Sequence, residues 1–405
     1  MIRRYQQQVL PYREFVALIA LMISLVALSI DAVLPALESI GDSLGVTNSN
    51  DNQLVIGALF IGMACGQLLF GPLSDSIGRR RSMMMGYCVF FLGSLLALIA
   101  NDLTTMLISR FLQGFGVSAP RVLSIAIVRD LYAGRSMAKV MSFVMMVFIL
   151  VPMLAPLFGQ LILTLANWRV IFVAIALVGL VSLGWYLLRQ GETLAANDQA
   201  DFTVTRTTSA LQFIFTHRVA LGYTIASGIM FGPFVFYLSS AQQLFQNIYG
   251  LEQWFPLYFA GLSCAFGVSS FTNGKQVMRF GMQVIIRFAL KLTTAISLLF
   301  VIVAWWFNGL PALWIMTMYM LLTFFCIGLL FGNFNALAME PLGHIAGMGA
   351  AIIGSLSTFI SAILAVIIGQ QFSETVYPLM ISFLLASSVT FLLIQWIESD
   401  KSRCR

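Results

Sequence analysis

Three charged side chains lie inside long apolar segments of this sequence, where a charge is costly. Asp31 lies in the segment 14–36, and Arg110 and Arg121 both lie in the segment 103–128. An ionised acid in hydrocarbon is unfavourable unless it faces a cavity or a partner. A carboxyl group whose proton affinity is set by burial and by a neighbouring arginine can exchange a proton when water reaches it. The pattern indicates proton exchange at Asp31 with Arg110 as its partner. The alternative is a static ion pair that fixes helix packing.

The two arginines are expected on one face of the same helix. Arg121 follows Arg110 by eleven residues, which is about 20° from three full turns and about 16 Å along the axis. Both should therefore face a cavity, where they would favour anionic or neutral polar ligands over lipophilic cations. The alternative for Arg121 is that its side chain extends along apolar surface to the membrane interface.

The composition predicts an all-α membrane protein. Of the 405 residues, 60% are hydrophobic and only 9% are charged, and apolar segments of about 20 residues, each long enough to cross a bilayer, recur along the chain. Segments of this length must be helices, because unpaired backbone groups are costly in lipid. The twelve expected spans are residues 14–36, 52–73, 83–100, 103–128, 138–163, 168–189, 218–242, 253–273, 284–307, 311–336, 346–370 and 375–397.

The distribution of charge predicts orientation and domains. Nearly all of the 22 lysine and arginine residues fall in the termini or in alternate loops, which places both termini in the cytoplasm. The net charge of +6 follows from this topology, so nucleic acid is not expected as a partner. The polar stretch 190–217 divides the chain into a first half, 1–189, and a second half, 218–405, each with six spans.

The basic loop 71–81 reads GPLSDSIGRRR and joins the second and third expected spans. It resembles the loop signature of the major facilitator superfamily, whose members have twelve helices in two halves. In that family the loop aspartate and arginine act with an acid at the end of span four as a cytoplasmic latch; the alternative here is a topology signal alone. The residues that the resemblance assigns to the latch are Gly71, Asp75, Gly78, Arg79, Arg80 and Asp130.

Two further motifs strengthen the resemblance. The run RFLQGFG, which begins at Arg110, is similar to the span-four motif of proton-coupled members, and this similarity links Arg110 to proton transfer. Pro152, Pro156 and Gly159 in the fifth expected span partly match the antiporter motif. The two prolines should bend that helix.

The first span and the end of the fourth span point to one branch of the superfamily. Asp31 followed by Pro35 is similar to the twelve-span drug:proton antiporters, and residues 129–132 resemble the bicyclomycin and chloramphenicol resistance branch. The resemblance implies a proton-coupled exporter of drugs or small amphiphiles in the bacterial inner membrane, working by alternating access. The residues expected to line its substrate cavity are Asp31, Arg110, Gln113, Arg121, Phe231, Phe234 and Tyr237.

Other functions fit the same sequence. A dedicated exporter of one endogenous metabolite or siderophore would use the same coupling residues, and a transporter-like sensor would bind a ligand without moving it. We find no nucleotide-binding loop and no nucleophile constellation in the sequence, so an enzyme is not expected. Neither histidine has companions at ligand spacing, and we expect no metal and no cofactor. The expected partners are a small-molecule substrate, protons and the lipid bilayer, and the expected state is a monomer.

Overall fold

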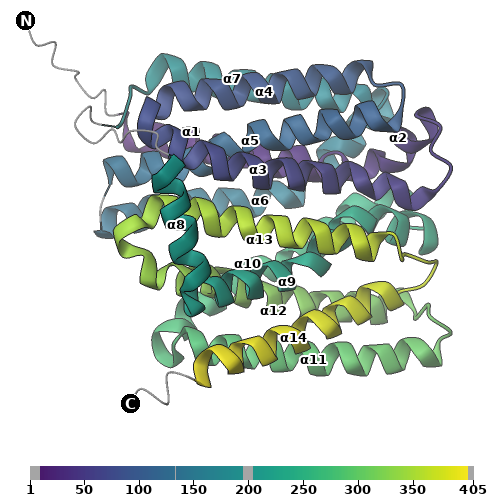
Figure 1. Ribbon diagram of the computed structural model, residues 1–405. Helices are drawn as coiled ribbons and strands as arrows, with labels where there is room; N and C mark the ends of the chain where they lie inside the picture. The colour runs from purple at the N-terminus through teal and green to yellow at the C-terminus, as the bar shows by residue number, and fades with distance from the viewer. Residues whose placement is uncertain (1–9, 133, 195–203, 400–405) are drawn as a thin grey trace, which may run out of the picture.

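The structure is a computed structural model that describes residues 10–132, 134–194 and 204–399. It is a bundle of long helices that run side by side (Figure 1). The α-helices are α1 (Tyr12–Asp31), α2 (Leu37–Ser43), α3 (Leu54–Ile77), α4 (Arg79–Ile99), α5 (Leu103–Leu131), α6 (Gly134–Leu165), α7 (Arg169–Arg189), α8 (Val204–Thr216), α9 (Arg218–Ala241), α10 (Phe255–Phe280), α11 (Met282–Trp306), α12 (Leu313–Met339), α13 (Ala346–Gly369) and α14 (Tyr377–Ser399). Short 3-10 segments are η1 (Leu34–Ala36), η2 (Ser49–Gln53), η5 (Glu252–Trp254) and η6 (Glu340–Ile345), and η4 (Gln242–Ile248) is a π-helix.

The all-α membrane fold is confirmed, but the count of twelve spans is not. Within the described residues, 11 helical segments are long and apolar enough to cross a membrane. The expected fifth span falls in α6, a helix of 32 residues, of which Leu150–Leu165 forms a shorter apolar segment. The twelfth crossing at α6 therefore stays a prediction, as does the cytoplasmic location of the termini.

Helices α1–α7 gather on one side of the bundle and α9–α14 on the other (Figure 1). The two groups meet where α3 packs against α13 and where α6 packs against α10. The boundaries at 189 and 218 remain an interpretation of the sequence.

The expected linker 190–217 contains a helix that the sequence analysis did not anticipate. Within the described part of this segment, α8 crosses one end of the bundle (Figure 1) and packs against α9 and α13. Ala210 and Ile214, four residues apart, are buried, whereas Ser209 and Gln212 are exposed. This is the pattern of an amphipathic helix lying on a surface. Residues 195–203 of the linker lie outside the described residues.

Two glycines make matching turns between consecutive helices, Gly78 between α3 and α4 and Gly281 between α10 and α11. We call the end of the bundle where these turns lie the basic end. Gly78 has φ +96° and ψ 157°, and Gly281 has φ +81° and ψ 158°. Only glycine adopts these positive φ values readily. The same backbone turn at corresponding positions of the two helix groups supports an internal repeat, with a second, less charged copy of the loop at residues 273–281.

Helix α5, which carries Arg110 and Arg121, is held closely against α3. A Cβ added at Gly62 would lie 2.0 Å from the Phe111 carbonyl oxygen, and one at Gly114 would lie 1.9 Å from the Leu59 carbonyl oxygen. Helices approach this closely only through small residues. The start of α5 is fixed by Asp102, whose carboxylate accepts hydrogen bonds from the Thr105 hydroxyl (2.7 Å) and the Thr105 backbone N–H (2.9 Å). These bonds hold the pKa of Asp102 below its ordinary value.

Candidate functional site

Asp31 lies where the first span is interrupted. Helix α1 ends at Asp31, and the 3-10 turn η1 and the short helix α2 follow. Pro35 lies four residues after Asp31 and has no N–H, so it cannot donate the helical hydrogen bond to the Asp31 carbonyl oxygen. The Asp31 side chain is buried, with the residue only 4% exposed. Within the described residues, no ion pair or side-chain hydrogen bond holds its carboxyl group.

Arg110 is fully buried beside this interruption, and within the described residues it does not form the static ion pair with Asp31 that was the alternative to proton exchange. Its guanidinium donates from Nη2 to the Ser29 carbonyl oxygen (2.8 Å) and from Nε to the Val55 carbonyl oxygen (3.1 Å). Nη1 donates to Oε1 of Gln113 (2.7 Å). Each of the three nitrogens therefore donates one hydrogen bond to a neutral acceptor. The partnership of Arg110 with Asp31 is indirect, through the last turn of α1.

Gln113 was expected to line the substrate cavity, but its side chain instead extends the hydrogen-bond network of Arg110 toward α4. Its Nε2 donates to the Ser94 hydroxyl (2.9 Å), which donates in turn to the Phe90 carbonyl oxygen (2.9 Å). Gln113 is fully buried between α4 and α5. It orients Arg110 by accepting one of its hydrogen bonds.

The antiporter-motif helix α6 contacts the interruption directly. A Cβ added at Gly159 would lie 2.0 Å from the Ala32 carbonyl oxygen, so only glycine permits this approach. Pro152 and Pro156 lie in the same helix, which continues through both. The structure thus brings Gly159 beside Asp31 in space, although 128 positions separate them.

The expected aromatic wall of the second helix group packs mostly within that group. The Tyr237 ring lies 4.7 Å from the Phe324 ring, and the Phe234 ring lies 5.6 Å from it, centroid to centroid. The buried hydroxyl of Tyr237 has no hydrogen-bond partner among the described residues.

A cavity of about 360 Å³ lies between the two helix groups and reaches the basic end at Asp75, Arg79 and Arg129. Of the residues expected to line it, Arg121 and Phe231 do so. The other five, which are Asp31, Arg110, Gln113, Phe234 and Tyr237, are not part of its lining in this conformation.

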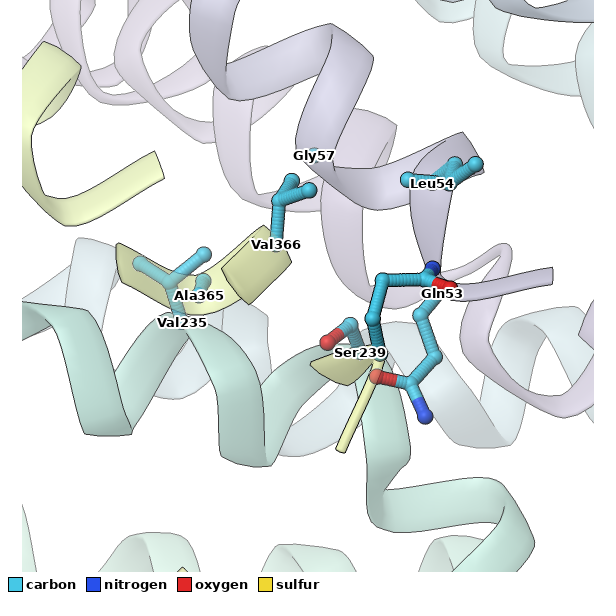
Figure 2. A pocket seen from close by; sticks show the side chains of 8 residues that line it. Gln53, Leu54, Gly57, Val235, Ser239, Ala365 and Val366 are labelled. Carbon is cyan, nitrogen blue, oxygen red and sulfur yellow. The ribbon is translucent and has the colours of Figure 1, made fainter. Parts of the chain in front are cut away.

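The opposite end of the bundle is closed by hydrogen bonds between the two groups, which we call the distal seal. Gln53 Nε2 donates to Gln243 Oε1 (2.7 Å), and Asn50 Nδ2 donates to the Phe372 carbonyl oxygen (2.9 Å). Gln242 Nε2 also donates to a Glu38 carboxylate oxygen (3.1 Å). Figure 2 shows Gln53 at the start of α3 facing Ser239, with apolar side chains of α9 and α13 beside it. The cavity is therefore closed toward this end of the bundle by the distal seal.

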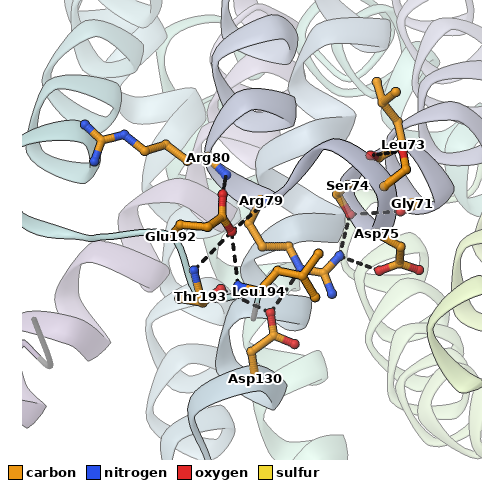
Figure 3. Close-up of polar contacts among 11 residues, drawn as sticks. Gly71, Leu73, Ser74, Asp75, Arg79, Arg80, Asp130, Glu192, Thr193 and Leu194 are labelled. Atoms are coloured by element: carbon orange, nitrogen blue, oxygen red, sulfur yellow. Dashed lines mark hydrogen bonds and ion pairs between the residues drawn. The ribbon is translucent and has the colours of Figure 1, made fainter. Parts of the chain in front are cut away.

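Of the six expected latch residues, Asp75 and Asp130 meet the buried guanidinium of Arg79 (Figure 3), whereas the Arg80 side chain donates to the Leu187 carbonyl oxygen (2.8 Å). The Arg79 guanidinium, whose side chain is 3% exposed, donates to Asp75 Oδ1 (2.5 Å) and to Asp130 Oδ2 (3.0 Å). It also donates to the Ser74 hydroxyl (2.7 Å). Gly71 lies on α3 one helical turn before Asp75. A Cβ added at Gly71 would lie 2.6 Å from the Cβ of Ala351 on α13. The loop thus connects α3, α4 and α5 and touches the second helix group.

Sequence reasoning missed the acid that completes this cluster, Glu192. Its carboxylate accepts the backbone N–H groups of Arg79 (2.9 Å) and Arg80 (3.0 Å) at the start of α4. An anion at a helix N-terminus satisfies free donors and interacts favourably with the helix dipole. Thr193 donates its hydroxyl to Asp130 Oδ2 (3.1 Å). The only signal in the sequence was an acid directly after the sixth span, which does not reveal a partner 113 positions earlier.

Comparisons with known proteins agree with this architecture. The family profile described as Major Facilitator Superfamily matches residues 19–366. YdgK of Bacillus subtilis (strain 168), an uncharacterized MFS-type transporter, is 30% identical over 358 residues, which cover 87% of each chain. A bicyclomycin resistance protein homolog of Haemophilus influenzae is 26% identical over 395 residues, which cover 96% of this chain and 98% of the relative.

A solved structure shares the fold. The human organic anion transporter MFSD10 (TETRAN) superposes with a TM-score of 0.70 at 18% identity, covering 96% of this chain and 100% of that one. At this identity the likeness concerns the fold alone. The relative named for bicyclomycin resistance agrees with the branch that residues 129–132 indicate. The resemblance inferred from the loop 71–81 is confirmed, and this chain belongs to the major facilitator superfamily.

Proposed function

We propose that this protein is a proton-coupled secondary transporter that exports drugs or related small amphiphilic molecules across the bacterial inner membrane by alternating access. The observation that carries the proposal is the position of Asp31, a buried acid at the interruption of the first span. Interrupted helices with unpaired backbone groups are a recurrent setting for coupling sites in secondary transporters. The partners of this activity are a small-molecule substrate and protons, and the working unit is a monomer.

The surroundings of Asp31 suit reversible protonation. No fixed ion pair among the described residues commits its carboxyl group to the charged form. Arg110 supplies a positive charge nearby while its own donors are used by carbonyl and amide oxygens. A change in water access at Asp31 therefore changes its protonation without breaking a salt bridge.

The arrangement of cavity and seal supports alternating access. The cavity reaches the basic end of the bundle, and the distal seal closes the opposite end. In the proposed cycle this state takes up substrate from the cytoplasm. Protonation of Asp31 from the outer side then accompanies release of substrate, after the seal has opened and the basic end has closed.

The Arg79 cluster is proposed to stabilise one end state of this cycle. The Arg79 side chain is only 3% exposed, so the attraction within its ion pairs is less screened by water than in a surface pair, and separating the charges costs more. Asp75 and Arg79 also line the cavity at the basic end. A movement of the second helix group across this end would change the environment of the cluster, as a conformational latch requires.

The assignment of drugs as substrates rests on the relative named for bicyclomycin resistance and on an amphiphilic cavity that both Arg121 and Phe231 line. The test is proton-gradient-dependent uptake of a panel of antibiotics and dyes into everted membrane vesicles. Wild type is compared with Asp31→Asn and with the control Asp42→Asn, which alters an exposed acid on α2. Uptake lost only in Asp31→Asn supports the proposal. Uphill uptake retained by Asp31→Asn would refute coupling through this residue.

A further inference from the structure

The guanidinium of Arg121 is available to a ligand in the cavity. Arg121 lies on α5 about 15 Å from the end of that helix at the basic end and lines the cavity. Among the described residues, its Nη1 donates to the Met63 sulfur at 3.2 Å. A thioether is a weak acceptor. The remaining donors of this arginine therefore have no acceptor among the described residues.

The other charges of the cavity do not neutralise Arg121. Asp75 and Arg79 pair with each other, and Arg79 also pairs with Asp130. The fourth charged residue of the lining is Arg129, whose guanidinium lies against Gly347. The charge left over in the cavity is therefore positive. In an apolar cavity such a charge acts more strongly than it would in water.

Gln67 provides a second donor in the same cavity. This α3 residue is 3% exposed and lines the cavity, and its buried Nε2 has no hydrogen-bond partner among the described residues. Its amide fits against α13 because residue 354 is glycine, where an added Cβ would lie 2.6 Å from Gln67 Oε1. A buried amide N–H without a partner is costly, and a bound acceptor would satisfy it.

The facing wall of the cavity is aromatic. Phe231 of α9 and Phe331 of α12 both line it, and their ring centroids lie 5.2 Å apart. Phe331 is 42% exposed, so part of this surface is open to a ligand. The cavity therefore offers an anion-binding wall on the first helix group and a ring-binding wall on the second.

We propose that the cavity selects molecules that carry an anionic group on an aromatic body. The anion binds Arg121 and Gln67, and the ring lies against Phe231 and Phe331. This inference rests on the proposed function, because it names the substrate class of the same transporter. It also explains why both helix groups would respond to one ligand, since the two ends of the molecule contact different groups.

The test is binding of two xanthene dyes of similar shape and opposite charge, anionic fluorescein and cationic rhodamine 6G, to the full-length protein in nanodiscs. We expect wild type to bind fluorescein more tightly than rhodamine 6G. Arg121→Gln should weaken fluorescein binding about tenfold or more, the loss expected for one charge-assisted hydrogen bond. Arg121→Lys should restore most of the preference. Phe231→Ala should weaken both dyes together.

Three results would overturn the proposal: no saturable binding of fluorescein, tighter binding of rhodamine 6G by wild type, or an unchanged ratio in Arg121→Gln. The Arg121→Lys variant keeps the charge and separates charge loss from misfolding, and Arg129→Gln shows whether a positive charge at the mouth is sufficient. Because the readout is binding, it is independent of transport. A charge preference without uptake in vesicles would refute export while supporting the ligand class.

Discussion

The guanidinium of Arg110 donates a hydrogen bond of 2.8 Å to the carbonyl oxygen of Ser29, in the last turn of α1. Carbonyl groups in the last turn of a helix have no intrahelical donor. The bond therefore fixes the end of α1 and, with it, the position of Asp31 two residues later. A buried arginine on α5 thus holds the interruption of the first span without an ion pair.

Arg110→Ala should lower stability strongly, because it leaves the carbonyl oxygen of Ser29 and Oε1 of Gln113 without this donor. Each buried acceptor left unsatisfied costs about 1–3 kcal/mol. Arg110→Lys should recover only part of the loss, since a compact ammonium group cannot reach the three separate acceptors to which the planar guanidinium donates. The measurement is the thermal unfolding midpoint of the purified protein, with Arg13→Ala, an exposed arginine on α1, as control. Equal midpoints for Arg110→Ala and Arg13→Ala would contradict the positioning role.

Gly159→Ala should impair transport by pushing α6 away from the interruption of α1. The added Cβ would lie 2.0 Å from the Ala32 carbonyl oxygen, which is backbone and cannot move aside easily. The matched control is Gly184→Ala on α7, where nothing lies within 4 Å of the added Cβ. That change should slightly stabilise its helix, by about 0.5–1 kcal/mol. The readout is initial uptake in everted vesicles at matched protein levels; normal uptake by Gly159→Ala would show that this contact is dispensable.

The fold was largely predictable from the sequence, because the need to bury apolar segments and satisfy the backbone in lipid leaves few solutions. The contact between Asp75 and Arg79 was also predictable, since the two residues lie on either side of the turn at Gly78 and follow a known signature. Asp130 came from the resemblance alone. The structure places all three within one hydrogen-bonded cluster.

The partners of Arg110 and Glu192 were not predictable in the same way. Arg110 binds backbone carbonyl oxygens, which every residue has, so no residue type in the sequence indicates these contacts. Glu192 binds the backbone N–H groups of Arg79 and Arg80, and contacts of this kind are likewise not indicated by any residue type. Sequence spacing also did not reveal how the expected cavity residues are divided, because Arg121 lines the cavity and Asp31 does not. Sequence spacing describes one helix and does not describe how the two groups tilt.

Glu192→Ala should destabilise the start of α4 and loosen the Arg79 cluster. Loss of a capping acceptor costs about 0.5–2 kcal/mol. Glu192→Gln should retain part of the effect, because its amide oxygen still accepts a hydrogen bond from a backbone N–H while the favourable charge at the helix N-terminus is lost. The experiment compares thermal midpoints with Glu374→Ala, an exposed acid outside the cluster. If Glu192→Ala and Glu374→Ala unfold together, the acid does not support α4.

Linking the two sides of the distal seal should stop transport reversibly. Gln53 and Gln243 belong to different helix groups and are joined by a hydrogen bond of 2.7 Å, so cysteines at both positions lie within reach of a short thiol crosslinker. The double variant Gln53→Cys/Gln243→Cys, in a chain without its native cysteines, should take up substrate until the reducible crosslinker is added and again after reduction. Each single variant serves as a control that the reagent alone does not inhibit. Full uptake by the crosslinked protein would mean that this end never opens, which is incompatible with alternating access through the cavity between the two helix groups.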